Sequence, residues 1–144
     1  MVFIFDENFS YRLADGINAL EEGNKSHGSP SKVYHIKRLG QELEILPSNG
    51  KAYSDEEVIE IAGKVGGIII TQDDDFKKIK HYHQLYKEHN VGVIFFKAGK
   101  ATRGYWNLVT HIITHWNSMK EKIDGQNPPF AFQVSSNGIQ AMNF

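Results

Sequence analysis

The stretch 68–76 reads IIITQDDDF, an apolar run that ends in Thr71 and is followed at once by three aspartates. A short run of β-branched residues without polar interruption is typical of a buried strand in a parallel sheet. The stretch 2–7, VFIFDE, has the same order, with Asp6 and Glu7 after its apolar run. Ligands of open α/β sheets bind beyond the carboxyl ends of the strands, so the sequence predicts a site of gathered carboxylates there.

Short apolar runs alternate with helical patterns along most of the chain. Further strands are predicted at 33–36 and 91–96. Helices are predicted at 9–22, at 54–65 behind a capping box at Ser54–Glu57, as a short helix or turn from Asp74, and from Trp106 to Met119 with Thr102 as the cap. This alternation predicts an α/β fold with a central, mainly parallel sheet and right-handed crossovers. The residues at 23–31 read as a polar loop, and those at 39–51 show no clear period apart from a turn at Asn49-Gly50.

The end of the chain breaks the alternation. After Pro128-Pro129, the apolar segments 130–134 and 139–144 flank Ser136-Asn137-Gly138, which predicts a β-hairpin. We expect this hairpin, residues 126–144, to extend a single domain of residues 1–144. It would add to an edge of the sheet, or form the surface of a homodimer or of a complex with a partner.

Composition narrows the class of protein. The chain has 144 residues, of which 40% are hydrophobic and 23% charged, enough for one domain with a sizeable core. It has no cysteine, which excludes disulfides and thiolate zinc sites and is compatible with the cytoplasm. The apolar start is too short for a signal peptide or a membrane helix. The net charge of -1 gives no overall attraction to nucleic acid.

The spacing of the acidic residues suggests a metal site. Asp73 and Asp75 are separated by one residue just after a strand, so a turn can point both carboxylates into one cleft. Asp6 would come from a neighbouring strand, and Asp55 or Glu56 from the first turn of a helix, where the dipole favours negative charge. Crowded carboxylates repel one another, and a divalent cation keeps them ionised. Mg²⁺ or Mn²⁺ held in this way indicates chemistry on phosphates.

A basic segment follows the second acidic cluster. Residues 77–103 carry seven lysines and arginines against a lone Glu88, with histidines and tyrosines among them. Such a segment beside an acidic site suggests a surface for a phosphate backbone, with Lys77, Lys78 and Lys97 as candidate substrate contacts. The alternative is a solvated helix face that is rich in lysine.

In these features the chain resembles a PIN-like domain of the kind found in toxins of bacterial type II toxin–antitoxin systems. The resemblance rests on FDEN at 5–8, SDEEV at 54–58 before an apolar helix, ITQDDDF at 70–76, the strand at 91–96 and the final hairpin. It spans nearly the whole chain in the right order. No single motif is specific, and it is the ordered set that identifies the family.

The resemblance implies a PIN-like three-layer fold and a metal-dependent endoribonuclease that hydrolyses RNA phosphodiesters with Mg²⁺ or Mn²⁺. It also implies a cognate antitoxin as protein partner. By position, Asp6 matches the metal ligand after the first strand, and Asp73 and Asp75 match the later acidic pair. Asp55 matches the acid at the helix start. Thr71 matches the hydroxyl residue that helps to orient the carboxylates in the family.

Within this scheme Asp6 and Asp73 would be direct ligands, while Asp75 and Asp55 would act through water or as a base. Two assignments stay open at this point. Asp74 extends the later cluster and could exchange roles with either neighbour. Glu56 could replace Asp55 at the helix start.

Two other functions compete with the nuclease. A receiver-like phosphoacceptor would also use Asp6 and Glu7, Asp73, and a lysine past a strand end, for which Lys97 qualifies. The doubled aspartates and the final hairpin fit that fold less well. The second rival is a PIN-like fold kept as a catalytically inactive binding module, because a lone aspartate after a strand often only caps a turn.

Several further residues have a structural and a functional interpretation. His111 and His115 are spaced to share a zinc ion, but without a third ligand an exposed helix face is the preferred interpretation. Trp106 and Trp116 are assigned to the core rather than to a platform for substrate. Asn8 is suited to hydrogen-bond the site's carboxylates, although it also fits a simple turn.

Overall fold

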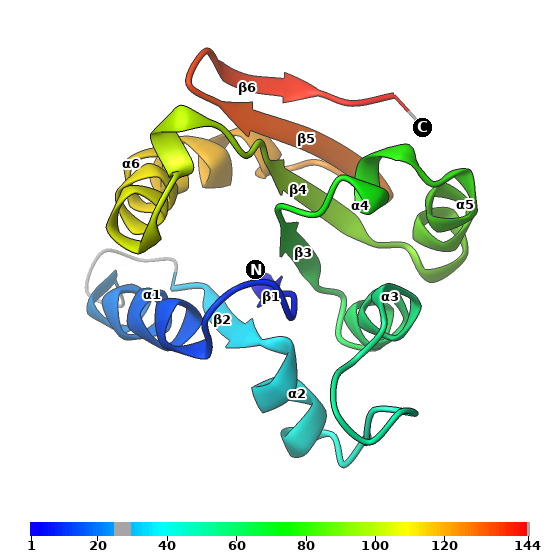
Figure 1. Ribbon diagram of the computed structural model, residues 1–144. Helices are drawn as coiled ribbons and strands as arrows, with labels where there is room; N and C mark the ends of the chain where they lie inside the picture. The colour runs from blue at the N-terminus through cyan, green and yellow to red at the C-terminus, as the bar shows by residue number, and fades with distance from the viewer. Residues whose placement is uncertain (25–29, 144) are drawn as a thin grey trace.

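The computed structural model describes residues 1–24 and 30–143, so most of the polar loop expected at 23–31 lies outside the described residues. The strands are β1 Val2–Phe5, β2 Lys32–His35, β3 Ile68–Thr71, β4 Gly92–Phe96, β5 Phe130–Ser135 and β6 Gly138–Ala141. They form one sheet in the order β2-β1-β3-β4-β5-β6 (Figure 1). All neighbouring pairs are parallel except the final one, in which β6 runs antiparallel to β5. The α/β fold and the C-terminal hairpin are therefore confirmed, and the hairpin extends the sheet at its edge.

The helices are α1 Tyr11–Gly23, α2 Ile36–Glu42, α3 Asp55–Lys64, α4 Asp75–Lys78, α5 Lys80–His89 and α6 Tyr105–Ile123, with a 3₁₀ turn, η2, at Lys100–Thr102. Side chains of a strand alternate between the two faces of a sheet. Accordingly Phe3 and Phe5 pack in the apolar layer that contains α1 and α6. Ile4 packs in the opposite layer, with α2, α3 and α5. The result is a three-layer arrangement with helices on both faces (Figure 1).

The sequence places α3 accurately. The Ser54 hydroxyl accepts a hydrogen bond from the Glu57 backbone N–H at 3.2 Å, and the Glu57 carboxylate accepts one from the Ser54 N–H at 3.0 Å. This is the predicted capping box, which satisfies two amide groups at the helix start. Asp55 therefore stands in the first turn of α3.

Other local predictions were wrong. Ile36 does not end β2 but begins α2, since the His35 ring accepts a hydrogen bond from the Lys37 N–H at 3.1 Å and so caps that helix. Thr102 does not cap α6, which begins at Tyr105 after Gly104. Instead, the Thr102 hydroxyl bonds to the backbone of its own 3₁₀ turn.

Across the described residues, none of the helices has both the length and the apolar character needed to cross a membrane.

Candidate metal centre

Four acidic side chains come together from separate parts of the chain. β1 and β3 are adjacent and parallel, with Phe5 opposite Ile70, so both strands end at the same edge of the sheet. Asp6 follows β1 directly, and the turn after β3 carries Asp73. Asp55 is the first residue of α3 and Asp75 the first residue of α4. The carboxyl edge of β1 and β3 is therefore the place where the sequence predicted acidic residues to gather.

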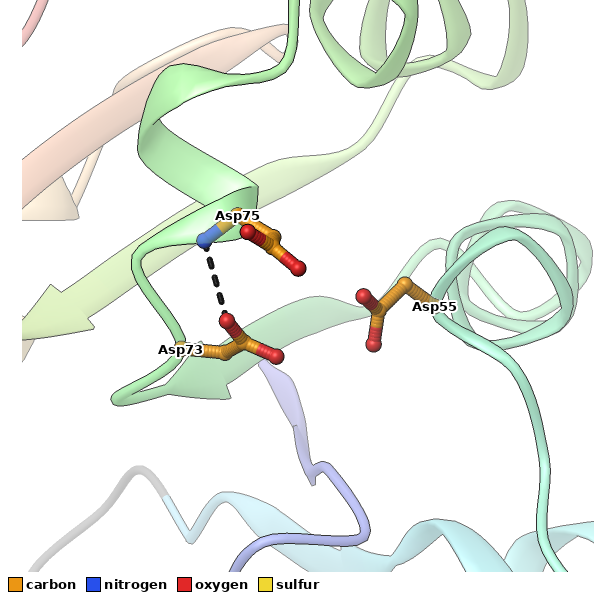
Figure 2. Close-up of side chains that lie close together, drawn as sticks. All are labelled: Asp55, Asp73 and Asp75. Carbon is orange, nitrogen blue, oxygen red and sulfur yellow. Dashed lines mark hydrogen bonds between the residues drawn. The ribbon is translucent and has the colours of Figure 1, made fainter.

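Three of these residues form a compact group. Asp55, Asp73 and Asp75 each offer one carboxylate oxygen, and these oxygens lie within 4.8 Å of one another (Figure 2). The Asp73 carboxylate also accepts a hydrogen bond of 2.9 Å from the backbone N–H of Asp75, which fixes the turn between them. Asp55 approaches from the opposite side, from α3. We call Asp55, Asp73 and Asp75 the acidic triad.

Asp6 is buried near the triad and is held by Thr71. Its side chain is 2% exposed and accepts hydrogen bonds from the Thr71 hydroxyl at 2.5 Å and from the Asn8 backbone N–H at 3.1 Å. The same hydroxyl oxygen accepts a bond of 3.0 Å from the Asp73 N–H. Thr71 thus joins Asp6 to the backbone of the turn that presents Asp73.

Burial and mutual repulsion make two carboxylates of this site harder to ionise. Burial raises the pKa of Asp6 to about 7, and the nearby charges of Asp55 and Asp73 add to this effect against the bonds from Thr71 and Asn8. Burial also raises the pKa of Asp55, and the charge of Asp73 adds to the rise. A carboxylate that is both buried and near like charges is costly to ionise, and a bound cation relieves that cost.

The structure separates residues that the sequence left as alternatives. Asp74 is exposed and its carboxylate pairs with Lys78 at 3.6 Å, outside the triad. Glu56 is exposed on α3, and its neighbour Asp55 is the one whose carboxylate belongs to the triad. Asn8 contributes its backbone N–H to Asp6, while its side chain is exposed.

The three candidate substrate lysines do not gather at the triad. Lys77 donates to the Gln133 side chain at 2.7 Å and lies over the Phe95 ring at 5.4 Å. Lys78 pairs with Asp74, as described above. Lys97 is exposed after β4 and lines a separate cavity of about 280 Å³ between η2 and the β5–β6 turn.

Sequence reasoning missed Tyr82 as a member of the site. Its hydroxyl donates a hydrogen bond of 3.2 Å to the Asp55 carboxylate. Burial and the charge of Asp55 raise the pKa of Tyr82 to about 12, so it remains a donor. Tyr82 lies on α5, a helix that the sequence did not delimit. In the sequence, Tyr82 is marked only by its place in a lysine-rich segment.

The histidine pair of α6 differs from its prediction. His111 is buried rather than exposed, and its ring lies 4.7 Å from that of His115. Within residues 1–24 and 30–143, the acidic triad is a group of three adjacent metal-binding side chains, and no such group contains these histidines. A shared zinc ion therefore gains no support.

Comparison with known proteins adds the family. A family model described as "PIN like domain" matches residues 1–98, about two thirds of the chain. The chain belongs to the PIN-like domain family. No curated protein and no solved structure gives a significant match.

The matched region of this PIN-like chain runs from β1 to just past β4, and it includes Asp6 and all three residues of the acidic triad. PIN-like domains are typically metal-dependent nucleases, which supports a nuclease-type fold and a divalent metal site. The match favours this interpretation over a receiver-like phosphoacceptor. Helix α6 and the β5–β6 hairpin lie beyond the matched residues.

Proposed function

We propose that this PIN-like protein is a metal-dependent endoribonuclease that hydrolyses RNA phosphodiesters. The observation that carries the proposal is the acidic triad, in which carboxylate oxygens from α3, the β3 turn and α4 lie within 4.8 Å of one another. A role as a turn cap would explain each aspartate separately, but it would not explain why three aspartates from different elements lie together. A divalent cation gives that convergence a physical reason.

The ligand atoms of the triad suit Mg²⁺ or Mn²⁺. All three residues offer carboxylate oxygens, the ligands that these hard cations prefer. Asp55, Asp73 and Asp75 would hold the ion. When bound, it would offset the charge of the phosphodiester and make water a better nucleophile.

The remaining residues of the chain would position these ligands. Thr71 ties the Asp73 turn to Asp6 through the two hydrogen bonds of its hydroxyl. Tyr82 holds the Asp55 carboxylate. Groups that orient metal ligands in this way commonly change metal affinity or activity about 10- to 100-fold when they are removed. Asp6 would act from near the triad, either on the ion or on the orientation of Thr71.

The proposal is tested by cleavage of a mixed RNA substrate by the purified protein with Mn²⁺, with Mg²⁺ or with EDTA. Asp73→Asn keeps the size of the side chain and removes its charge. We expect it to lower cleavage at least about 100-fold, because a triad ligand is lost. Asp74→Asn is the matched control, since Asp74 is the next residue, is exposed, and pairs with Lys78 outside the triad. We expect it to leave the rate within about 2-fold.

The outcomes separate the competing functions. Metal-dependent cleavage that Asp73→Asn abolishes and Asp74→Asn retains supports the nuclease. Equal cleavage by all variants would indicate a contaminating nuclease and remove the assignment. Binding of Mn²⁺ without cleavage of any RNA would favour the binding module.

The toxin role and its partners are further parts of the proposal. They rest on the resemblance stated above, together with a cytoplasmic location, which rests on the composition. An antitoxin would be sought as the product of an adjacent gene that copurifies with this protein and suppresses its cleavage of RNA. A homodimer would use the free edge of β6, the last strand of the sheet. Light scattering of the purified protein measures that assembly.

A further inference from the structure

Three aromatic side chains are exposed at the starts of α1 and α6. Tyr11 is 42% exposed, Tyr105 49% and Trp106 75%, although Trp106 was assigned to the core from the sequence. The rings of Tyr105 and Trp106 stand edge to face, with their centroids 5.4 Å apart. We call Tyr11, Tyr105 and Trp106 the aromatic platform. Adjacent apolar rings in solvent commonly mark a binding surface.

The platform lies at the same edge of the sheet as the acidic triad. α1 follows β1 and begins five residues after Asp6, while α6 follows β4, so both helices start at the carboxyl ends of strands (Figure 1). The pKa of Arg12, on α1, is raised mainly by the hydrogen bond from its Nε to the Tyr11 hydroxyl. Tyr105, at the start of α6, adds an electrostatic contribution to the same rise, so the two helix starts lie near each other.

Cations lie over one ring of the platform and on the segment that precedes the other two. Arg12 and Arg38 both lie over the Tyr11 ring, at 5.6 and 4.9 Å from its centroid. Lys97, Lys100 and Arg103 are exposed on the segment that leads from β4 to Tyr105. Within the described part of the chain, neither Arg12 nor these three residues form an ion pair, so their charges are available to a ligand.

We propose that the aromatic platform and its cations bind a single-stranded segment of the RNA, with bases stacked on Trp106 and Tyr105. This inference rests on the proposed function, because it takes RNA as the substrate. Stacking on aromatic side chains needs the flat face of a base, which a duplex hides and a single strand exposes. The cations would hold the phosphates between the stacked bases.

A second candidate position for a phosphate is a cavity at the same edge of the sheet. Lys97 and Lys100 line the cavity of about 280 Å³, together with the hydroxyl and amide side chains of Ser135, Ser136 and Asn137. Lysines and small polar groups are common contacts of phosphate oxygens. The cavity lies past the end of β4, and β4 is the neighbour of β3, so it shares the sheet edge with the triad.

The platform has one competing occupant, another protein chain. Protein interfaces also use exposed aromatic rings, but their centres are depleted in lysine. Here Arg12 lies over the Tyr11 ring, and cations unpaired within the described residues precede Tyr105 in the chain, which favours a ligand with repeated negative charge. A protein partner is treated as an outcome of the test.

The test is binding of a labelled oligo(U) in EDTA, where no metal-dependent cleavage can occur. The chain has two tryptophans, so the emission of Trp106 is read against that of half-buried Trp116 alone. We expect oligo(U) to quench the wild-type emission. We expect Trp106→Ala to weaken binding about 5- to 100-fold and Trp106→Phe to retain most of it. Leu20→Ala, which removes a 64% exposed apolar side chain from the last turns of α1, is the matched control.

In Trp106→Ala the emission of Trp116 reports on the fold, because its indole N–H is held by Glu21 at 2.8 Å. Unchanged affinity in a folded Trp106→Ala variant would overturn the proposal. So would equal quenching by a duplex of the same length, or quenching that follows protein concentration rather than RNA, which would assign the ring to contact between copies. Quenching by oligo(U) without cleavage of any RNA would support RNA binding by the platform and contradict the nuclease. Cleavage without quenching would support the nuclease and contradict RNA binding by the platform.

Discussion

The carboxyl edge of the sheet has two halves that are built in opposite ways. Beyond β1 and β3, Asp6 is buried, Asp55 and Asp73 are half-buried and Asp75 is exposed. Asp6, Asp55 and Asp73 each accept at least one hydrogen bond from the protein. Beyond β4 and β5, the charged residues are cations that are exposed and have no ion partner within the described residues. The carboxylates of Asp6, Asp55 and Asp73 are therefore held in place before any ligand arrives, while the cations of the basic half are exposed to solvent.

This difference matches the two tasks that the proposed reaction requires. A metal site works when its ligands are held in place, since reorganising them would cost affinity. A surface for single-stranded RNA must accept many base sequences, so mobile lysines and flat rings suit it. Substitutions of Thr71 and of Lys97 with Lys100 test whether the halves differ in this way, and substitution of Asp6 tests what the buried acid costs the protein.

Among the residues that position the triad without belonging to it, the largest effect is expected from Thr71, because its hydroxyl joins two parts of the acidic half. Thr71→Val keeps the shape of the side chain but removes the hydroxyl that joins Asp6 to the Asp73 turn. We expect a loss of about 10- to 100-fold in cleavage or in Mn²⁺ affinity. Thr71→Ser restores the hydroxyl and should restore most of both. The measurements are initial rates at several Mn²⁺ concentrations and calorimetric titration of Mn²⁺.

A Thr71→Val variant with wild-type rate and Mn²⁺ affinity would show that the hydroxyl network is not needed. The acidic half would then be a loose cluster, and its contrast with the basic half would disappear.

A smaller effect is expected from Lys97 and Lys100 on the basic half. Their combined replacement by alanine should weaken oligo(U) binding and lower the slope of log affinity against log salt by about 1.4, because two phosphate contacts are lost. The control is Lys78→Ala, since Lys78 already pairs with Asp74 at 3.6 Å and is less available to RNA. The measurement is binding in EDTA at four salt concentrations. An unchanged slope in the double variant would mean that these lysines do not touch the phosphates.

The same contrast explains which features the sequence predicts. Buried strands leave a strong pattern, so the apolar runs before Asp6 and Asp73 predicted β1 and β3, and the capping box predicted the start of α3. Parallel strands must end at one edge, and this brought the acidic residues together. The choice between Asp55 and Glu56 depends on the angle of α3, which the sequence does not specify.

The basic half left weaker signals. Trp106 follows a helical period with Val109 and Ile113, and a tryptophan in such a period is usually buried, yet its ring is 75% exposed. Trp106 stands in the first turn of α6, and whether that turn is covered depends on how α6 packs, which a helical period does not specify. Tyr82 was missed for a related reason, because its contact with Asp55 depends on how α5 packs against α3.

The last prediction concerns the cost of the buried acid. Burial first, and then the charges of Asp55 and Asp73, raise the pKa of Asp6 from 3.8 to about 7. Between these two pH values the folded state keeps a proton that the unfolded state gives up. The metal-free protein should therefore lose stability as the pH rises from about 4 to about 7, and should not regain it above that. Asp6→Asn removes the ionisation and should raise the unfolding temperature at pH 8 by about 3–10 °C.

The measurement is thermal unfolding of both proteins in EDTA at pH 5 and pH 8. The gain from Asp6→Asn should be larger at pH 8, where the wild-type carboxylate is charged, than at pH 5, where it is mostly protonated. Asp15→Asn is the control, because Asp15 is exposed and pairs with Arg38 at 2.9 Å. An equal gain at both pH values would mean that Asp6 ionises as easily in the folded as in the unfolded chain. The buried charge of Asp6 would then not lower the stability of the folded protein. A bound cation would not be needed to offset the cost of ionising Asp6.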